Sequence, residues 1–404
     1  MGFLFKDDLH DRFGTWPLAY SRYGGADIGE LQAIARAVGD GDDGAFHAAW
    51  SKAAEALERE AEQALAKSRR DEARELLLKA SCFHSISYRL LFGKPVDPRV
   101  LAAHHRQVAA FDRAMSLADP PVAGFEIPFE GGSLPAYFIP AAGHAGEVRP
   151  LLILTNGYDA TITDMFDASA SAALHRGYHC LLFDGPGQGS LLIDRGITLR
   201  PDWKTMIRAV VDAARGMPRV DPDRIALSGW SLGGYLAPRA ASGEPRLAAC
   251  IADPGQLSIA EGFRKNAVTL GATPVAARNL GELDQGTIDE MAKIIESNRP
   301  LHWSIVQRGF WVNGVDTLRD YLRSVERFTL VDRAERIACP TLITRASNDP
   351  IADTAETLFA KLTCRKALIR FTAADGADGH CEMRNRSLLN RRVLDWLDDI
   401  FATA

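Results

Sequence analysis

The chain reads Gly229-Trp230-Ser231-Leu232-Gly233 between an apolar run at 224–228 and a helix-like segment at 236–241. This order predicts a strand, a cramped turn that holds a serine, and the start of a helix. Glycines flank the turn because a Cβ at either position would collide with adjacent strands. We therefore predict that Ser231 is an exposed nucleophile. The alternative is a plain turn serine, and the joint presence of both glycines, the strand and the helix disfavours it.

The same turn predicts a site that binds negative charge. The Leu232 amide lies at the positive end of the following helix, where it would bind charge that develops on a substrate oxygen. A second donor is expected from the loop after the apolar run 151–155, which reads Asn156-Gly157-Tyr158-Asp159. The Tyr158 amide is the candidate donor in that loop.

Three neighbours of these donors are predicted to contact the substrate. Gly157 allows the backbone to approach a bound molecule closely, and Trp230 precedes the serine directly. Asp159 either faces the substrate or caps the following helix, and the sequence leaves both interpretations open.

A serine hydroxyl needs a histidine that takes its proton and an acid that orients the histidine ring. Behind such a turn the acid and then the histidine are expected to follow later strands of the chain. Asp349 follows the apolar run 341–345, and His380 follows the run 367–372. The carboxyl ends of parallel strands meet at one edge, so we predict that both side chains reach Ser231. Asp353 is the alternative acid, and we favour Asp349 because it lies nearer the strand end.

Strands and helices alternate through most of the chain after residue 120. A hairpin is predicted at 123–140, with its turn at Gly131-Gly132. Buried strands are predicted at 151–155, 179–184, 224–228, 247–252, 341–345 and 367–372. Helical patterns fill most of the gaps, so the fold class is predicted to be α/β, with a mostly parallel central sheet covered on both faces.

The domain organisation follows from where the pattern changes. Residues 28–117 are helical in pattern, which predicts an all-helical N-terminal domain at 1–120. More than eighty residues separate the strands that end near Asp253 and begin near Pro340, too many for an irregular loop. We predict a core at 121–254 and 337–404, interrupted by a helical cap at 255–336 that excludes water from the site. Four aromatic residues of the cap either line a pocket or, as helical spacing favours, form its core: Phe263, Trp303, Phe310 and Trp311.

Composition excludes several classes of partner. A formal charge of -5 without a basic block argues against nucleic acid, so the expected partner is a small-molecule substrate. The chain has no apolar stretch near the ~20 residues of a membrane span, and its acidic start is unlike a secretory signal. Six scattered cysteines imply no disulfide framework. We expect a cytoplasmic enzyme without membrane contact, and the helical N-terminal domain is a candidate homodimer surface.

No cofactor or metal is predicted. The loop at 183–190 is rich in glycine, but its glycines alternate and do not run straight into a helix as a dinucleotide fingerprint requires. We interpret it as a tight loop near the serine. No histidine, cysteine and carboxylate residues show the spacing of metal ligands.

Taken together, the turn at 229–233, the loops at 156–159 and 184–189, and the Asp349 and His380 pair resemble the α/β-hydrolase superfamily over residues 122–402. The helical N-terminal domain and the helical insert resemble a narrower group. That group includes 2,6-dihydroxypseudooxynicotine hydrolase and fungal hydrolases that shorten polyketide chains.

The resemblance implies a serine hydrolase that cleaves a carbon-carbon bond next to a ketone through an acyl-enzyme intermediate. It also implies an extra acidic residue near the triad, for which Asp253 and Glu261 are the candidates. A carboxylesterase is the alternative activity, followed by a prolyl-oligopeptidase-like peptidase. A non-catalytic binding protein of this fold is disfavoured because serine, acid and histidine are all present.

Overall fold

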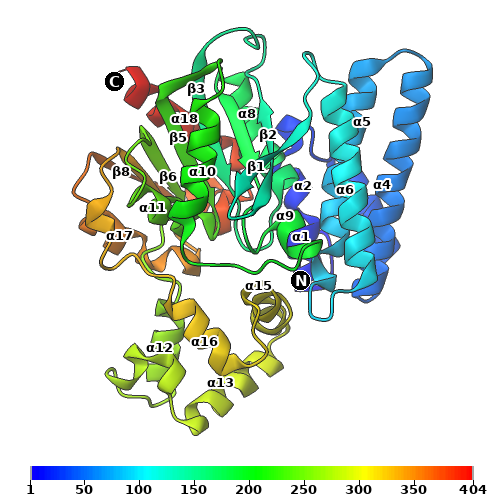
Figure 1. Cartoon of the computed structure of the whole chain (residues 1–404). Coiled ribbons are helices and arrows are strands. Elements are labelled where there is room, and N and C mark those ends of the chain that lie inside the picture. The colour runs from blue at the N-terminus through cyan, green and yellow to red at the C-terminus, as the bar shows by residue number, and fades with distance from the viewer. Residues whose placement is uncertain (1, 403–404) are drawn as a thin grey trace.

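The computed structural model describes residues 2–402, which form an eight-stranded sheet flanked by helices, a helical N-terminal region and a helical lobe (Figure 1). The strands are β1 (Gly124–Phe129), β2 (Gly132–Ile139), β3 (Arg149–Thr155), β4 (His179–Phe183), β5 (Val220–Trp230), β6 (Ala249–Asp253), β7 (Thr341–Ala346) and β8 (Lys366–Phe371). Their order is β1-β2-β4-β3-β5-β6-β7-β8. Only the β1–β2 and β2–β4 pairs are antiparallel, which confirms the predicted α/β fold with a mostly parallel sheet.

Helices cover both faces of this sheet. One layer holds α10 (Trp203–Arg215) and α11 (Gly233–Ala241), and the opposite layer holds α8 (Ser171–His175) and α18 (Arg386–Ala402). Every residue of the central strands β4 and β6 is buried, as expected for parallel strands covered on two sides. The carboxyl ends of the parallel strands therefore form a rigid platform for the site. Short helices lie near this layered core: α7 (Ile162–Met165), α9 (Gly189–Ile193) and α17 (Ala355–Lys361).

Between residues 2 and 123 the structure shows helices, turns and loops but no strand. The helices of this N-terminal region are α1 (Asp8–Gly14), α2 (Trp16–Ala19), α3 (Ile28–Val38), α4 (Asp43–Ala66), α5 (Arg70–Tyr88) and α6 (Pro98–Ser116). One stripe of α4 is buried, from Phe46 and Trp50 to Ala64, and its charged residues lie on the other side. Buried Arg89 ties the region to the core, because its guanidinium pairs with Asp164 at 2.7 Å and donates to the carbonyl oxygen of Asp159.

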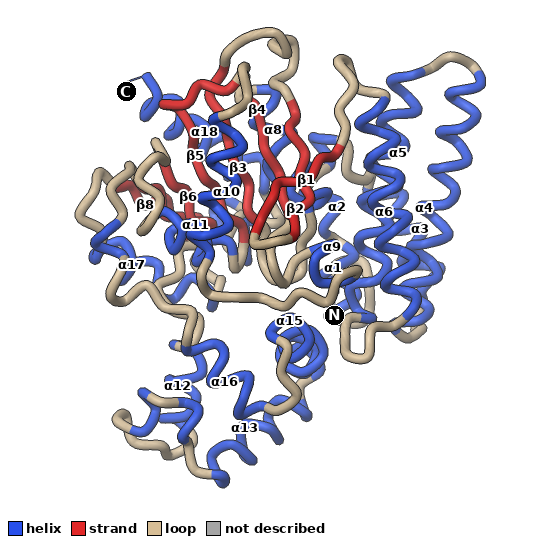
Figure 2. Tube along the Cα trace, viewed as in Figure 1, coloured by secondary structure: helices blue, strands red, loops and turns tan. Residues whose placement is uncertain are grey.

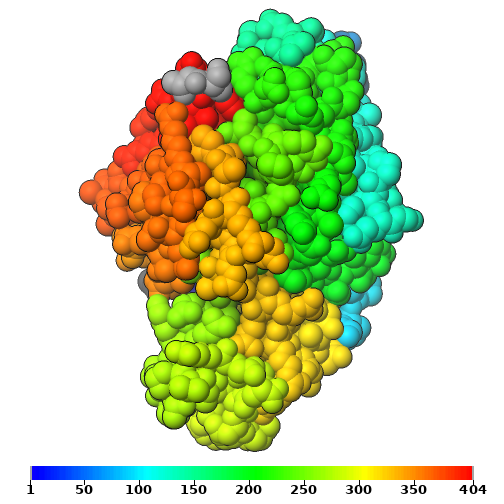
Figure 3. Space-filling view, turned by 60° about the vertical axis from the view of Figure 1, so that its left-hand side comes forward, coloured from blue at the N-terminus to red at the C-terminus, as the bar shows by residue number. Residues whose placement is uncertain are grey.

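The lobe between β6 and β7 contains only helices and loops (Figure 2). Its helices are α12 (Glu261–Thr269), α13 (Gln285–Ser297), α14 (Arg299–His302), α15 (Trp311–Asn313) and α16 (Leu318–Glu326). It projects from the body as a distinct lobe (Figure 3) and buries an apolar cluster of its own, including Leu280, Met291 and Leu322. We call residues 258–329 the cap. Two antiparallel segments join it to the core, where Ser258 and Thr329 form a β-bridge.

The four aromatic residues of the cap divide between two cores. Phe263 and Phe310 pack on Tyr321 inside the cap, at 5.8 Å between ring centroids in each pair. Trp303 and Trp311 pack instead against Phe92 of the N-terminal region. Arg299 adds ion pairs from the cap to Asp7 and Asp43. The cap is therefore braced against the N-terminal helices as well as joined to the sheet.

The domain limits at 120, 254 and 336 remain a prediction, although helices give way to strands between Ser116 and Gly124. Within residues 2–402, no helix is both long enough and apolar enough to cross a membrane.

Candidate functional site

Ser231 lies in the sharp turn between β5 and α11 and adopts a left-handed conformation, with φ at 58°. The turn is closed so tightly that a Cβ on Gly229 would lie 1.9 Å from the carbonyl oxygen of Gly233. A Cβ on Gly233 would lie 2.7 Å from the carbonyl oxygen of Thr155. Side chains are thus excluded on both sides of the serine, for the reason expected from the sequence.

His380 connects this serine to a buried carboxylate. Its Nε2 lies 2.9 Å from Ser231 Oγ, and its Nδ1 lies 2.8 Å from Asp349 Oδ2. Because an ionised carboxylate only accepts hydrogen bonds, Nδ1 carries the proton and Nε2 is free to accept from the serine hydroxyl. Asp349 is 4% exposed and also accepts from the Ile351 amide, which fixes its orientation. The structure therefore brings Ser231, His380 and Asp349 together.

Asp353, the alternative acid, points elsewhere. Its carboxylate lies 3.2 Å from Lys265 Nζ on the cap. It lines the same cavity as the serine, but within residues 2–402 it forms no hydrogen bond or ion pair with the histidine. The backbone after His380 is unusual, since Cys381 and Glu382 both adopt positive φ angles, at 52° and 51°. Such a conformation is costly for residues other than glycine and persists here beside the candidate base.

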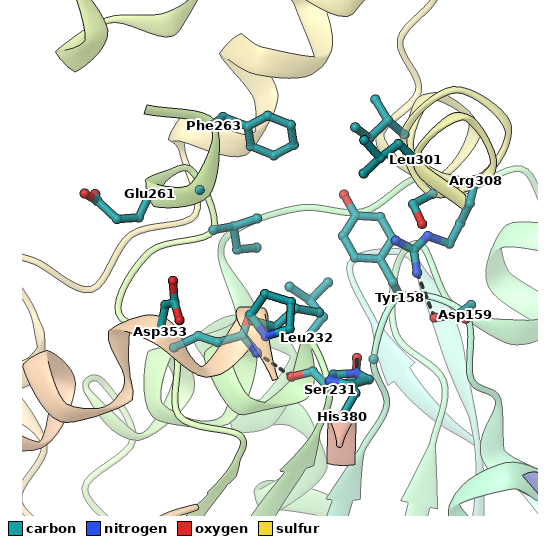
Figure 4. A pocket seen from close by; sticks show the side chains of 18 of the residues that line it. Tyr158, Asp159, Ser231, Leu232, Glu261, Phe263, Leu301, Arg308, Asp353 and His380 are labelled. Carbon is teal, nitrogen blue, oxygen red and sulfur yellow. Dashed lines mark hydrogen bonds and ion pairs between the residues drawn. The ribbon is translucent and has the colours of Figure 1, made fainter. Parts of the chain in front are cut away.

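A cavity of about 440 Å³ opens in front of Ser231, between the sheet and the cap (Figure 4). Ser231 and His380 form its floor, and Phe263 and Leu301 of the cap lie across from them. Most of the wall is apolar, including Ile259, Met291, Ile295, Ile305, Tyr321 and Met383. The site suits a medium-sized, mainly apolar small molecule.

The two predicted oxyanion donors lie side by side at this floor. A Cβ on Gly157 would be 2.8 Å from the Ser231 Cβ and 3.3 Å from the Leu232 nitrogen, so the two loops touch. Within the described residues, the Leu232 and Tyr158 amides have no hydrogen-bond acceptor. Two backbone donors beside the serine hydroxyl can stabilise an oxyanion in water-poor surroundings.

The loop at 184–189 supports the donor loop from behind. Gln188 Nε2 donates to the carbonyl oxygens of Asn156 and Gly157, at 2.9 and 3.1 Å. Asp184 accepts from Asn156 Nδ2 at 2.6 Å, and burial raises the pKa of Asp184 to about 7. The sequence predicts a tight loop near the serine, and the structure adds that this loop supports the donor loop through Gln188.

A charged pair, Asp159 and Arg308, forms part of the cavity wall. Asp159 and Arg308 lie 3.1 Å apart, and the Arg308 guanidinium also stacks on Tyr158 at 4.8 Å from the ring centroid (Figure 4). Burial alone would raise the pKa of Asp159, but the Arg308 charge holds it below its usual range. Asp159 therefore lies at the site as a carboxylate and does not cap a helix, since Thr161 occupies the N-cap of α7.

The remaining predicted residues differ in position. Trp230 lines the cavity although it is almost fully buried, and its ring contacts Trp16. Glu261 also lines the cavity, with Arg264 3.6 Å away. Asp253 does not line it. Asp253 is buried behind the serine turn, where it accepts from Thr344 Oγ1 at 3.0 Å and forms an ion pair with Arg386.

Several residues that line the cavity are not predicted from the sequence. Arg12 and Trp16 reach the site from α1 and α2, and Arg308 reaches it from the cap. Nothing in the local pattern of residues 8–19 signals a site, because their contacts with β5 and the cap arise only in the folded chain. Gln188 and Gln256 are also not predicted, and both support loops of the site: Gln256 donates to the Ser231 carbonyl oxygen at 2.6 Å.

Among residues 2–402, no group of three or more His, Cys, Asp or Glu side chains is placed to hold a metal ion.

The chain is similar in sequence to known hydrolases. A model described as the alpha/beta hydrolase family matches residues 151–387. Hydrolase LUC6 of a Fusarium species is 33% identical, with 98% of this chain and 96% of the relative covered. The 20-hydroxy-prefusarin hydrolase FUS2 of Gibberella moniliformis is also 33% identical, with 99% of this chain and 97% of the relative covered.

Solved structures show the same architecture. The crystal structure of the 2,6-dihydroxy-pseudo-oxynicotine hydrolase superposes with a TM-score of 0.73 over 95% of each chain, at 24% identity. AbyA5 wild type superposes with a TM-score of 0.61 over 98% of this chain and 99% of its own, at 19% identity. These similarities confirm the resemblance inferred from the motifs and the layout.

Proposed function

The chain belongs to the alpha/beta hydrolase family, and from this premise we propose that it is a serine hydrolase with Ser231 as nucleophile. His380 serves as general base and Asp349 as the residue that orients it. One observation carries the proposal: the hydrogen bonds from Asp349 through His380 to Ser231 end at the floor of the cavity. A retained nucleophile, base and acid with this geometry disfavours a non-catalytic binding protein.

In the proposed mechanism, Ser231 Oγ attacks a substrate carbonyl while its proton passes to His380 Nε2. The Leu232 and Tyr158 amides bind the oxyanion of the tetrahedral intermediate. His380 then delivers the proton to the leaving carbon or oxygen, and an acyl ester on Ser231 remains. A water molecule, deprotonated by His380, hydrolyses this ester and releases a carboxylic acid.

We propose that the bond cleaved is a carbon-carbon bond next to a ketone in a polyketide-like or aromatic molecule. Two observations support this choice: the mainly apolar cavity between the sheet and the cap, and the whole-length similarity to fungal hydrolases, one of which is named for 20-hydroxy-prefusarin. An ester is the alternative, since both bonds break through the same acyl intermediate. A prolyl-oligopeptidase-like activity gains no support from an N-terminal region that is helical between residues 8 and 116.

Kinetics on paired substrates test the choice of bond. The enzyme is assayed with an aryl ester and with a 1,3-diketone of similar size, and Ser231→Ala is the control for both. Turnover of the diketone at a rate comparable to or above that of the ester supports the carbon-carbon assignment. Preference for the ester by orders of magnitude refutes it and leaves a carboxylesterase.

A further inference from the structure

The charged side chains around the cavity are paired, with one exception. The pairs are Lys265 with Asp353 at 3.2 Å, Arg308 with Asp159 at 3.1 Å, and Glu261 with Arg264 at 3.6 Å. Arg12 also lines the cavity, but its side chain has no ion pair or hydrogen bond among residues 2–402. The cavity wall therefore includes one cation that no carboxylate pairs with directly, although the charges of Asp159 and Asp349 act on it from a distance.

The fold holds Arg12 at this place. It lies in the last turn of α1, and its neighbours Leu9 and Phe13 are buried, so the helix cannot rotate the side chain away. Arg12 itself is exposed, with its guanidinium carbon 5.8 Å from the centroid of the Phe13 ring. Trp16, which follows on α2, lines the same wall. The N-terminal region thus contributes a cation and an aromatic ring to a site otherwise built by the loops at the sheet edge and by the cap.

Its surroundings favour an anion. Partial desolvation by the surrounding protein and the nearby charge of Arg308 lower the pKa of Arg12, while the charge of Asp159 raises it. A guanidinium stays protonated at neutral pH. A bound anion would offset the repulsion between Arg12 and Arg308. Its planar fork of N–H donors matches the two oxygens of a carboxylate.

We propose that Arg12 binds a carboxylate of the substrate. This rests on the proposed hydrolase function and narrows its substrate class to monoanionic compounds with an apolar body and a free carboxyl group. A single negative charge suffices, because the other charges that line the cavity are already compensated. Arg12 acts as a specificity residue, and its contact persists from substrate to transition state, so its removal raises KM more than it lowers kcat.

Matched esters test the proposal. Mono-4-nitrophenyl adipate carries a free carboxylate, and 4-nitrophenyl methyl adipate is its neutral counterpart. The wild-type enzyme should prefer the acid by about 10- to 100-fold in kcat/KM, as charge-assisted hydrogen bonds suggest. Arg12→Met should abolish the preference, and Arg12→Lys should keep part of it. Arg36→Met, which removes an exposed arginine of α3, should leave the preference intact.

The ester assays distinguish failure of the carboxylate proposal from failure of the hydrolase proposal. If the wild type hydrolyses both esters equally through Ser231, the carboxylate proposal is overturned and the hydrolase proposal stands. If hydrolysis of both esters persists in Ser231→Ala, the proposed function is overturned.

Binding provides a second test that needs neither turnover nor an Arg12 variant. Calorimetric titration of the Ser231→Ala protein compares monomethyl adipate with dimethyl adipate at low and high salt. The monoanion should bind at least about tenfold more tightly, with an advantage that shrinks as salt screens the charge. Equal binding of the two compounds contradicts the proposal.

Discussion

Gln188 donates a hydrogen bond from its side-chain amide to the carbonyl oxygen of Gly157, over 3.1 Å. The peptide that joins Gly157 to Tyr158 is trans, so its N–H points away from its carbonyl group. By holding that carbonyl from behind, Gln188 turns the Tyr158 amide to the side opposite the brace. Gln188 is therefore a positioning residue for the proposed oxyanion site.

Replacement of Gln188 by leucine should lower kcat by about 10- to 100-fold with little change in KM, because a misaligned oxyanion donor affects the transition state more than the bound substrate. Steady-state kinetics measure the split. The affinity for an aryl trifluoromethyl ketone, which mimics the oxyanion, should fall in parallel. Unchanged inhibitor affinity would show that the variant disturbs only the stability of the loop.

Replacement of the carboxylate by an amide should have very different effects at Asp349 and at Asp353. Asp349→Asn removes the negative charge and offers the His380 Nδ1 an amide donor, which favours the wrong tautomer, so kcat should fall by about 10³- to 10⁴-fold. Asp353→Asn disturbs only the pair with Lys265 and should lower kcat by less than about tenfold. The same assay under identical conditions compares them. A larger loss from the Asp353 variant would reassign the acid.

The serine turn should tolerate no side chain at Gly229. An alanine Cβ there meets the Gly233 carbonyl oxygen at 1.9 Å, and the conflict involves backbone that has no room to move. Gly229→Ala should reduce the free energy of unfolding by about 2 kcal/mol or more, measured by urea denaturation. Gly29→Ala is the matched control, since its Cβ meets nothing within 4 Å on helix α3 and should stabilise by up to ~1 kcal/mol. Similar effects of both substitutions would contradict the strained turn.

The Asp184 carboxyl should make stability depend on pH. Burial raises its pKa to about 7 in the folded chain, against an ordinary value near 4 in the unfolded chain. Between these values the folded state holds a proton that the unfolded state releases, so this contribution is full below about pH 4 and is lost as pH rises to about 7. The loss amounts to roughly 1.4 kcal/mol per pH unit.

Denaturation of the wild type and of Asp184→Asn across pH 4 to 8 isolates this contribution. As pH rises from about 4 to about 7, the free energy of unfolding of the wild type should fall relative to that of Asp184→Asn. Above about pH 7 the difference between the two proteins should stay level. A difference that does not vary with pH would refute the shifted pKa.

The sequence predicts local features of this fold well. The turn around Ser231 is recognisable because steric exclusion acts on adjacent residues, and the acid and histidine because they follow strands of a parallel sheet. The choice between Asp349 and Asp353 needs geometry, since both lie in one loop. Asp253 shows a limit of the same reasoning: it ends β6 at the correct edge, yet its side chain points to the buried Arg386 instead of into the cavity.

The sequence pattern does not predict contacts between segments that lie far apart in the chain. Arg12 lies in a short helix whose sequence indicates only a buried face and an exposed face. Its position beside the site depends on how the N-terminal helices pack on the core and the cap, through groups such as Arg89 and Trp303. Periodicity within α1 carries no information about that packing.

Trapping of the acyl intermediate tests the central claim most directly. A rapidly hydrolysed aryl ester is mixed with the enzyme and quenched in acid within the first turnovers, and the digested protein is analysed by mass spectrometry. The account predicts that the acyl mass appears on the peptide containing Ser231 and is absent from the Ser231→Ala protein. Turnover that proceeds with no adduct, or with the adduct on another residue, would contradict Ser231 as the nucleophile.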